Sequence, residues 1–348
     1  MNKIPVAVIG ASGYSGTELL RLLLFHERAD LVCLTSRQSA GKALSDEQPR
    51  FRGLPKAEAL KFCEPTMENL EASGAKLAFL ALPHGVAYQF AEPLLERGWR
   101  VIDLSDVFRV QDADAYAAFR EHNHPAPHLL PRAVYGLPEI HREAIRDTSL
   151  VACPGCYPTS MIIPLVPLLR AGCIDPDSIC ISAMSGVSGA GRKAAIPLLF
   201  VECNESVRPY NIPKHRHLAE VEQELSIAAG RSVMASFTPH LVPITAGIAT
   251  TIYANATESA DPTSVGNALT EAYSNEPFVR LLGEGTLPDT KHVVGTNYID
   301  IGWVHDPRTN RFVICCAEDN LGKGAASQAV QNFNLLHDLP ETTGLLRV

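Results

Sequence analysis

The stretch "IPVAVIGASGYSGTELLRLLLF", Ile4–Phe25, places an apolar run, a glycine-rich turn and a helical pattern in direct succession. The run is typical of a buried strand, and the leucines after the turn recur at helical spacing. Gly10, Gly13 and Gly16 follow one another at intervals of three residues. Glycines there let the backbone approach a pyrophosphate closely. The positive end of the helix that follows interacts favourably with the negative charge of the pyrophosphate. The stretch predicts a dinucleotide-binding unit, with a purely structural turn as the alternative.

Short apolar runs and helical patterns continue to alternate up to about residue 150, which is typical of a parallel sheet covered by helices. Longer strand-like runs follow between residues 174 and 314 and indicate a second, mixed or antiparallel sheet. Residues 320–339 have the spacing of a helix that could return to the first domain. We therefore expect an α/β protein with a Rossmann-like domain, 1–152 plus 318–348, and a catalytic and dimerisation α+β domain, 153–317.

The second predicted strand, "LVCLTS", ends at Ser36 and is followed by Arg37. A site selective for NAD usually has an acidic residue here for the ribose hydroxyls. A hydroxyl and a guanidinium suit a 2′-phosphate instead, so the sequence favours NADP. The alternative is an ordinary solvated arginine in a loop.

Composition limits the classes of partner. Hydrophobic residues make up 46% of the 348 residues, and the net charge is −8, from 30 basic and 38 acidic residues. The chain has no dense basic run for nucleic acid, no signal peptide pattern and no apolar stretch long enough for a membrane span. Its nine cysteines predict reduced thiols in the cytoplasm. Four of them lie in apolar runs where we expect burial: Cys33, Cys173, Cys180 and Cys315.

The stretch "VACPGCYPTS", Val151–Ser160, carries the strongest candidate nucleophile. Cys156 follows a strand pattern and precedes a helical one, in which Thr159 and Ser160 could satisfy backbone donors. A helix start favours a thiolate. A redox pair with Cys153 is the competing interpretation, although the long chain and its nucleotide-type turn do not fit a thioredoxin-like fold. The sequence lacks a second C-x-x-C, so we predict no metal site.

Two histidines at the start of a later helical pattern could act as the base that such a nucleophile needs. "KHRHLAEVEQEL" contains His215 and His217, and histidine exchanges protons near neutral pH. Other motifs contain candidate anion-binding side chains, "DLSDVFRV" and "SGVSGAGRK". Their candidate residues are Ser105, Arg109, Ser185, Ser188 and Arg192.

Taken together and in order, several motifs resemble those of the N-acetyl-γ-glutamyl-phosphate reductases of arginine biosynthesis. They are "GASGYSGTELLRLL", "LPHG", "YGLPE", "PGCYPT", "SGVSGAGRKA", "HRH", "PHLVPI" and "EDNLGKGAASQAVQ". Together they span nearly the whole chain, and "GCYPT" with "SGVSGAGR" is specific. The related aspartate-semialdehyde dehydrogenases share the architecture but usually differ around the thiol.

The resemblance implies an NADPH-dependent reduction of an acyl phosphate to a semialdehyde and phosphate, through a thioester on Cys156. It implies that His217 is the acid/base partner, ahead of His215, and that Arg109, Ser105 and Arg192 are near the substrate. It also implies self-association as a dimer or tetramer. The cofactor residues would be Gly10, Ser12, Gly13, Tyr14, Ser15, Gly16, Ser36, Arg37, Ser188, Gly189 and Asn320.

Two positions depart from the family pattern. Ala246 stands in "TAGI", where the family often has arginine, and Cys153 precedes "PGC", where other residues are usual. The first departure leaves open the same chemistry on a carrier-bound aminoadipyl or glutamyl phosphate. A non-catalytic nucleotide-binding relative is a further alternative. For the second we hypothesise only an oxidative link between Cys153 and Cys156.

Overall fold

The computed structural model describes residues 3–83, 85–120 and 122–346, so His84 of "LPHG" lies outside the described residues. The chain forms two compact units. Unit 1 contains the chain up to Ala113, His124–Pro154 and the chain from Ala325; unit 2 contains Asp114–Asn123 and Gly155–Gly324. The predicted domain division stays a prediction. The units differ from it because Asp114–Asn123 and residues 318–324 group with unit 2, while Cys153 and Pro154 group with unit 1.

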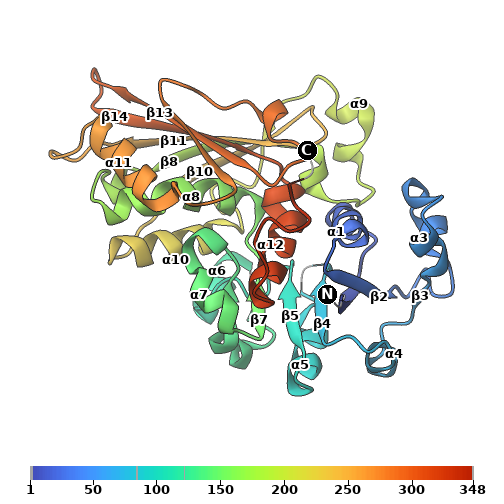
Figure 1. Cartoon of the computed structure of the whole chain (residues 1–348). Helices are drawn as coiled ribbons and strands as arrows, with labels where there is room; N and C mark the ends of the chain where they lie inside the picture. The colour runs from blue at the N-terminus through green and yellow to red at the C-terminus, as the bar shows by residue number, and fades with distance from the viewer. Residues whose placement is uncertain (1–2, 84, 121, 347–348) are drawn as a thin grey trace. The chain divides into compact units, whose positions relative to one another are not determined.

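Unit 1 is built on a seven-stranded sheet in the order β3-β2-β1-β4-β5-β7-β6, with every pair parallel. Figure 1 shows its strands and helices along the chain. The strands are β1 (Ile4–Ile9), β2 (Ala29–Thr35), β3 (Phe62–Cys63), β4 (Leu77–Leu80), β5 (Arg100–Asp103), β6 (Ala133–Tyr135) and β7 (Leu150–Ala152). The helices are α1 (Tyr14–Phe25), α2 (Leu44–Glu47), α3 (Pro55–Ala59), α4 (Met67–Ala72), α5 (Tyr88–Glu96), α7 (Pro138–Asp147) and α12 (Ser327–Leu336), with the 3-10 turns η1 (Pro49–Phe51) and η2 (Pro127–Arg132).

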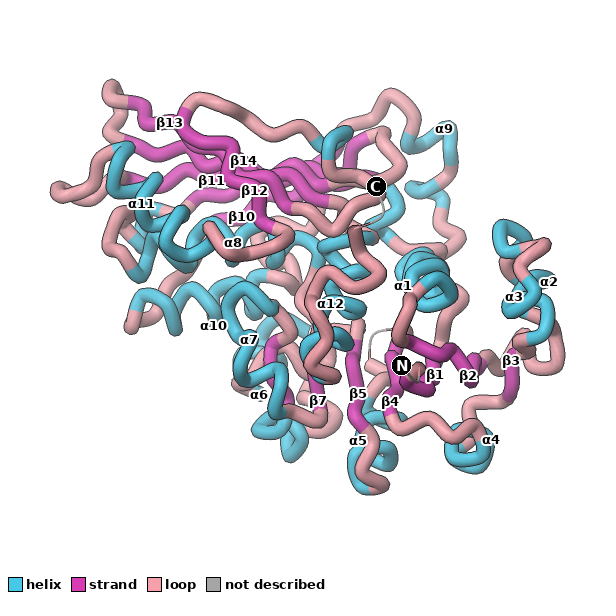
Figure 2. Tube along the Cα trace, in the orientation of Figure 1, coloured by secondary structure: helices cyan, strands magenta, loops and turns pink. Residues whose placement is uncertain are grey.

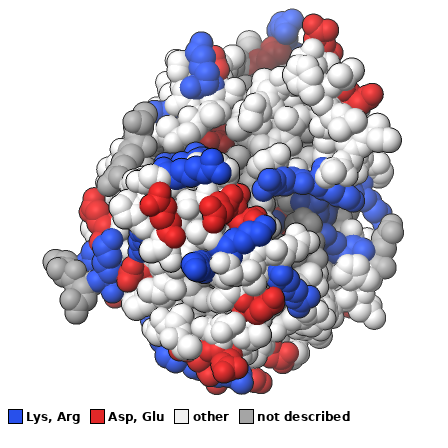
Figure 3. Space-filling model, turned by 90° about the vertical axis from the view of Figure 1, so that its right-hand side faces the viewer, with Lys and Arg blue, Asp and Glu red and all other residues white. Residues whose placement is uncertain are grey.

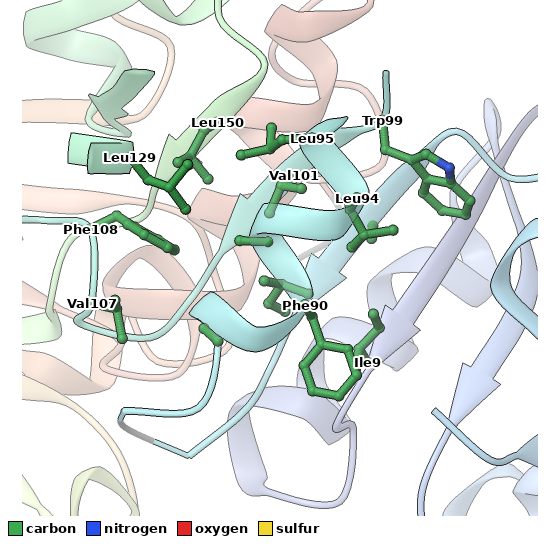
Figure 4. Close-up of a cluster of buried hydrophobic side chains, with 14 of the residues drawn as sticks. Ile9, Phe90, Leu94, Leu95, Trp99, Val101, Val107, Phe108, Leu129 and Leu150 are labelled. Atoms are coloured by element: carbon green, nitrogen blue, oxygen red, sulfur yellow. The ribbon is translucent and has the colours of Figure 1, made fainter. Parts of the chain in front are cut away.

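The central strands of this sheet are apolar on both faces because helices and loops cover both. All four residues of β4 are buried, as are the last four of β1. Figure 4 shows one side of the core, where Phe90 and Leu94 of α5 and the ring of Trp99 pack over the sheet. The Trp99 ring is fully buried. Continuous burial of this kind is the rule for parallel sheets, which confirms the predicted Rossmann-like fold.

The C-terminal helix α12 packs on elements near the start of the chain, as predicted. It contacts α1, α7 and β5. His26, which ends α1, lies with its Nε2 atom 3.0 Å from Oδ1 of Asn334 in α12. The Asn334 amide in turn donates to the carbonyls of Glu341 and Thr343. These contacts attach the C-terminal segment to the rest of unit 1.

Unit 2 is built on a second seven-stranded sheet, in the order β12-β13-β14-β11-β8-β10-β9 and with both parallel and antiparallel pairs. This confirms the predicted mixed sheet. Its strands are β8 (Cys180–Gly186), β9 (Arg208–Pro209), β10 (Ser236–Val242), β11 (Ile248–Asn255), β12 (Val279–Glu284), β13 (Ile299–Asp306) and β14 (Arg311–Glu318). Its helices are α6 (Ala113–Arg120), α8 (Cys156–Arg170), α9 (Phe200–Cys203), α10 (Leu218–Ala229) and α11 (Pro262–Tyr273), with η3 (Pro176–Ser178), η4 (Val187–Ala190), η5 (Ile196–Leu198), η6 (Thr290–His292) and the π-helical turn η7 (Gly322–Ala326).

Helices cover one side of this mixed sheet. Helix α8 contacts β11, β14, α10 and α11, and Figure 2 shows the cyan helices gathered on one side of the magenta strands. Side chains on the other face are more exposed, including Met184 at 46% and Tyr253 at 39%. Cys180, which we expected to be buried, is exposed on β8. An apolar run does not tell which strand residues face the covered side.

The surface mixes charges of both signs. Acidic and basic side chains are interspersed over the face shown in Figure 3. In the described part of the chain, no helix is long and apolar enough to cross a bilayer.

Candidate active site

Cys156 is the first residue of α8, directly after the N-cap Gly155, whose backbone is extended. No side chain caps this helix start. We expected Thr159 and Ser160 to satisfy backbone donors, and this expectation was wrong. Their hydroxyls instead donate to carbonyls, that of Thr159 to Gly155 at 3.1 Å and that of Ser160 to Tyr157 at 2.8 Å. The positive end of α8 lies at Cys156, where it favours a thiolate.

The two predicted histidines stand at the start of α10, as the sequence indicated. His217 is its N-cap and is 4% exposed, and its backbone N–H donates to Nδ1 of His215 at 3.2 Å. Both rings meet the Tyr157 ring edge-on, with centroid distances of 5.6 Å for His215 and 6.0 Å for His217. Because Tyr157 is adjacent to Cys156 in the chain, the start of α10 lies against the start of α8.

Glu220 joins these two helix starts directly. Its carboxylate accepts the backbone N–H of Gly155 at 3.1 Å, and its side chain is 2% exposed. Glu220 stands three residues after His217, so both share one face of the first turn of α10. The carboxylate therefore fixes the residue that immediately precedes the thiol.

Burial and positive neighbours keep His215 uncharged. Its pKa is lowered to about 3, first by burial and then by the nearby guanidinium groups of Arg216 and Arg120. Burial and Arg216 also lower the pKa of Arg120 to about 10, while Glu220 opposes this shift. Arg120 comes from α6, which is far from α10 in sequence but belongs to the same unit. His215 is therefore neutral at any pH where the protein would work.

Tyr157 and Tyr210 both pack against the histidine rings. The Tyr210 hydroxyl donates to the Tyr157 hydroxyl at 3.0 Å, and the Tyr157 hydroxyl donates to the His240 carbonyl at 3.4 Å. Burial raises the pKa of both phenols, that of Tyr210 to about 12. Both groups therefore stay protonated and act as hydrogen-bond donors.

Ser188, Gly189 and Asn320 lie together, although they are far apart in sequence. The Asn320 amide donates to the Ser188 hydroxyl at 2.9 Å, and its oxygen accepts the Gly247 N–H at 2.8 Å. A Cβ atom at Gly189 would lie 2.9 Å from the Ser185 hydroxyl. A side chain at position 189 would therefore require the Ser185 hydroxyl to move. Arg192, in the same loop, is exposed.

In unit 1, the turn after β1 is closely packed at two of its three glycines. Gly10 has a φ of +87°, and a Cβ there would lie 2.6 Å from Cδ2 of Leu82, which follows β4. A Cβ at Gly16 would lie 2.8 Å from the Ala11 backbone, whereas one at Gly13 would meet nothing within 4 Å. Gly13 is also the N-cap of α1, which has no side-chain cap and no acidic residue in its first turn. An anion fits at this helix start, beside Ser12, Tyr14 and Ser15.

The strand order places this turn where open α/β sheets bind their ligands. The order reverses between β1 and β4, and the turn extends from the carboxyl end of β1. Ser36 and Arg37 follow β2, the neighbouring strand; Arg37 is exposed, and the Ser36 hydroxyl accepts the Ser39 N–H at 3.2 Å. These residues fit a dinucleotide with a phosphate on its adenosine ribose.

The other predicted residues of unit 1 lie in the loop after β5. The Ser105 hydroxyl donates to Asp103 at 2.7 Å, and Arg109 donates to the Leu104 carbonyl at 3.0 Å. Burial raises the pKa of Asp103 to about 6, and Ser105 and Arg109 oppose this shift. Burial and Asp103 raise the pKa of the Cys153 thiol to about 12. Cys153 is therefore a protonated, buried thiol rather than a reactive one.

Sequence reasoning missed three residues of the unit 2 cluster: Glu220, Tyr210 and Gly324. Glu220 could have been found from its spacing after His217. Tyr210 and Gly324 give no such signal, because only the fold brings them to α8. A Cβ at Gly324 would lie 2.8 Å from the Cys156 Cβ. Among the described residues, no group of three or more His, Cys, Asp and Glu side chains is placed to hold a metal ion.

Comparison with known proteins identifies the family. Residues 5–148 match the semialdehyde dehydrogenase NAD binding domain, and residues 156–320 match the semialdehyde dehydrogenase dimerisation domain. An N-acetyl-gamma-glutamyl-phosphate reductase of Akkermansia muciniphila is 56% identical over 99% of both chains. The chain belongs to the N-acetyl-gamma-glutamyl-phosphate reductase family. Reductases of this name from Citrifermentans bemidjiense and Moorella thermoacetica are 48% and 47% identical, each over 98% of both chains.

Solved structures agree on the fold of this reductase family. Aspartate semialdehyde dehydrogenase II of Vibrio cholerae has a TM-score of 0.73 at 22% identity, covering 97% of this chain and 99% of its own. The aspartate semialdehyde dehydrogenase of Candida albicans, solved with NADP, has a TM-score of 0.72 at 18% identity, with the same coverage. The comparisons confirm the predicted family, the oxidoreductase class and a nicotinamide dinucleotide as cofactor.

Proposed function

We propose that the protein reduces N-acetyl-γ-glutamyl phosphate with NADPH to N-acetylglutamate semialdehyde and phosphate, as part of arginine biosynthesis. The reductases named above support the substrate. The observation that carries the proposal is the meeting of two helix starts at Cys156. Helix α8 carries the Cys156 thiol, and helix α10 carries His217 and Glu220, whose carboxylate accepts the Gly155 N–H.

The first step forms a thioester. His217 takes the thiol proton, the Cys156 sulfur attacks the acyl carbon, and the bond from that carbon to the phosphate oxygen breaks. Phosphate leaves with the electron pair of that bond. His217 is the better base of the two histidines because His215 gives its Nδ1 to a backbone N–H and has its pKa lowered to about 3.

The second step releases the aldehyde. NADPH, when bound, supplies the hydride that reduces the thioester carbon. The helix start at α8 stabilises the negative charge that develops on the carbonyl oxygen and then on the departing sulfur. His217 returns its proton to the thiolate, so Cys156 ends the cycle as it began.

We assign a set of cofactor residues within each unit. Gly10, Ser12, Gly13, Tyr14, Ser15 and Gly16 would hold the pyrophosphate. Ser36 and Arg37 would hold the 2′-phosphate, since a guanidinium binds phosphate through paired donors. Ser188, Gly189 and Asn320 would contact the nicotinamide, and the hydrogen bond from Asn320 to Ser188 supports a shared role for those two residues.

The substrate's anionic groups need cationic partners. We assign Arg109 to the phosphate or the carboxylate, with Ser105 and Arg192 as further contacts. Arg109 is 5% exposed and already donates to the Leu104 carbonyl, which holds its guanidinium in place. Ser105 is engaged by Asp103, so its role depends on a rotation of the hydroxyl.

The reverse reaction provides the test. With N-acetylglutamate semialdehyde, phosphate and NADP⁺, the enzyme should form NADPH at a rate that depends on phosphate. The variant Cys156→Ser should lose turnover and keep NADP binding. Unchanged turnover in that variant, or a folded wild type without phosphate-dependent NADPH formation, would contradict the proposal and would favour a non-catalytic nucleotide-binding role.

A second candidate is the same chemistry on a carrier-bound aminoadipyl or glutamyl phosphate. Ala246 is the reason to test it, because the family often has arginine at this position; this half-buried residue lies against the turn that leads to Ser188. A Cβ at Gly186 would lie 2.8 Å from the Ala246 backbone nitrogen. A larger basic side chain at position 246 would therefore stand beside that turn. Comparing kcat/KM for free and carrier-linked substrates distinguishes the two candidates.

We also propose that the protein is a homo-oligomer in the cytoplasm. The exposed face of the unit 2 sheet presents Met184 and Tyr253 on neighbouring strands, and this unit matches a domain described as a dimerisation domain. A second copy of the chain would cover these apolar side chains. The nine free cysteines fit a reducing compartment.

A further inference from the structure

The segment that follows β14 is held at several points within unit 2. Asp319 accepts the Gly295 N–H at 2.7 Å and the Leu321 N–H at 2.9 Å. Asn320 bridges Gly247 and Ser188. The N–H of Gly324 then donates to the Asp319 carbonyl at 2.9 Å. The segment 318–324 is therefore a fixed bracket rather than a loose connection.

Two glycines in this bracket press against different neighbours. A Cβ at Gly322 would lie 2.5 Å from the Thr296 carbonyl oxygen. A Cβ at Gly324 would lie 2.8 Å from the Cβ and 3.1 Å from the Cα of Cys156. Real side chains essentially never come this close, so each glycine is needed where it stands.

The Glu318 carboxylate lies at the same point. A Cβ at Gly324 would also lie 3.1 Å from Oε1 of Glu318, whose side chain is fully buried, as is that of Lys323. The backbone of Cys156 therefore packs against buried atoms of the bracket, which have no free space to move into. A group added at residue 324 has to displace Cys156 or the bracket itself.

We propose that Gly324 is a positioning residue for Cys156. The bracket 318–324 would hold the Cys156 thiol at a fixed position relative to the Asn320 and Ser188 side chains. One short segment touches the nucleophile at Gly324 and the proposed nicotinamide contacts at Asn320. The inference rests on the proposed function for its catalytic consequence, but the contact itself does not. A displacement of about 1 Å at a reacting atom can lower a rate on the order of 100-fold.

Gly324→Ala tests the proposal, with Gly266→Ala in α11 as the matched control in the same unit but outside the bracket. We expect the first variant to lower kcat at least ten-fold, with the KM for NADPH little changed. We also expect slower alkylation of Cys156 by iodoacetamide, followed by mass spectrometry of its peptide, because the added methyl group crowds the thiol. Gly266→Ala adds the same methyl group 3.3 Å from a Trp303 ring atom, outside the bracket, and should leave Cys156 alkylation near the wild-type rate.

Two outcomes overturn the proposal: a folded Gly324→Ala with wild-type kcat and alkylation, or equal changes in alkylation in both variants. Alkylation reports on Cys156 whether or not it is the nucleophile, so this test can fail independently of the proposed function. If Gly324→Ala does not fold, Asp319→Asn loosens the bracket, because only one of the two side-chain oxygens that accept the Gly295 and Leu321 N–H groups remains. It should lower kcat and speed up alkylation, and a folded Asp319→Asn that behaves as wild type also overturns the proposal.

Discussion

His217 and His215 are separated by one residue but differ in chemistry because their surroundings differ. The His215 ring is enclosed by Tyr157, Tyr210 and Phe237, and its pKa is lowered to about 3. It cannot take up a proton near neutral pH. Its Nδ1 atom instead accepts the His217 N–H. We therefore interpret His215 as support for His217 rather than as a second base.

We predict that His217→Asn lowers kcat by about 100- to 10,000-fold, the usual contribution of a positioned acid or base. His215→Asn should lower it less. Since His215 stays neutral above about pH 4, its replacement should leave the acid limb of the pH–rate profile in place. A profile whose acid limb disappears in His215→Asn would contradict this assignment.

The cysteines show what the sequence can and cannot indicate about single residues. The position of Cys156 before a helical pattern predicted its place at a helix start. Nothing in the spacing predicted that Cys33 and Cys63 would lie with their sulfur atoms 3.7 Å apart on neighbouring strands. Such a contact depends on which strands pair and on which side each residue faces, and neither is encoded locally.

At the scale of elements, the turn after β1 combines a folding role with a binding role. Gly10 has a positive φ and close neighbours, so the fold requires glycine at this position. Gly13 has a negative φ and open space around it, so its glycine serves the ligand. The sequence predicted all three glycines as one motif. Only the structure separates their roles.

We predict that Gly10→Ala destabilises the protein by more than about 2 kcal/mol, from left-handed backbone strain and the contact with Leu82. Gly13→Ala should fold normally and raise the KM for NADPH roughly ten-fold, which corresponds to about 1.4 kcal/mol. Thermal unfolding and steady-state kinetics of both variants check this. A Gly13→Ala protein with wild-type KM would place the pyrophosphate elsewhere.

The starts of α8 and α10 were predicted as separate features and proved to be one structure. Sequence patterns placed Cys156 and the two histidines at helix starts, because the helical spacing of the residues that follow them is a local signal. The contact between Glu220 and Gly155 is long-range and has no local signal. The hydroxyls of Thr159 and Ser160 went to carbonyls because a helix interior offers those acceptors at close range.

At the scale of the whole molecule, each unit includes chain from distant parts of the sequence. Helix α12 belongs to unit 1, and the segment Asp114–Asn123, which contains Arg120, belongs to unit 2. The change from alternating to strand-rich patterns predicted two sheets. It did not predict the transfer of Asp114–Asn123, since a short helix carries no signal about which core it joins.

We predict that the exposed face of the unit 2 sheet mediates self-association. Replacing both Met184 and Tyr253 by lysine should shift the protein toward smaller species, because like charges would face each other across the interface. Light scattering after size-exclusion chromatography measures this. A matched double replacement at Glu143 and Arg146 on α7, which are remote in sequence from that face, should leave the mass unchanged. Retention of the wild-type mass in the Met184 and Tyr253 variant would exclude this face.

The central claim is that Cys156 carries the acyl group. The most direct measurement mixes the enzyme with N-acetylglutamate semialdehyde and NADP⁺ without phosphate, and follows NADPH by absorbance and acylation by mass spectrometry. We predict a rapid burst of one NADPH per site, an N-acetylglutamyl group on the Cys156 peptide, and renewed turnover when phosphate is added. Turnover with Cys156 unmodified, or a burst that acylates another residue, would contradict the account.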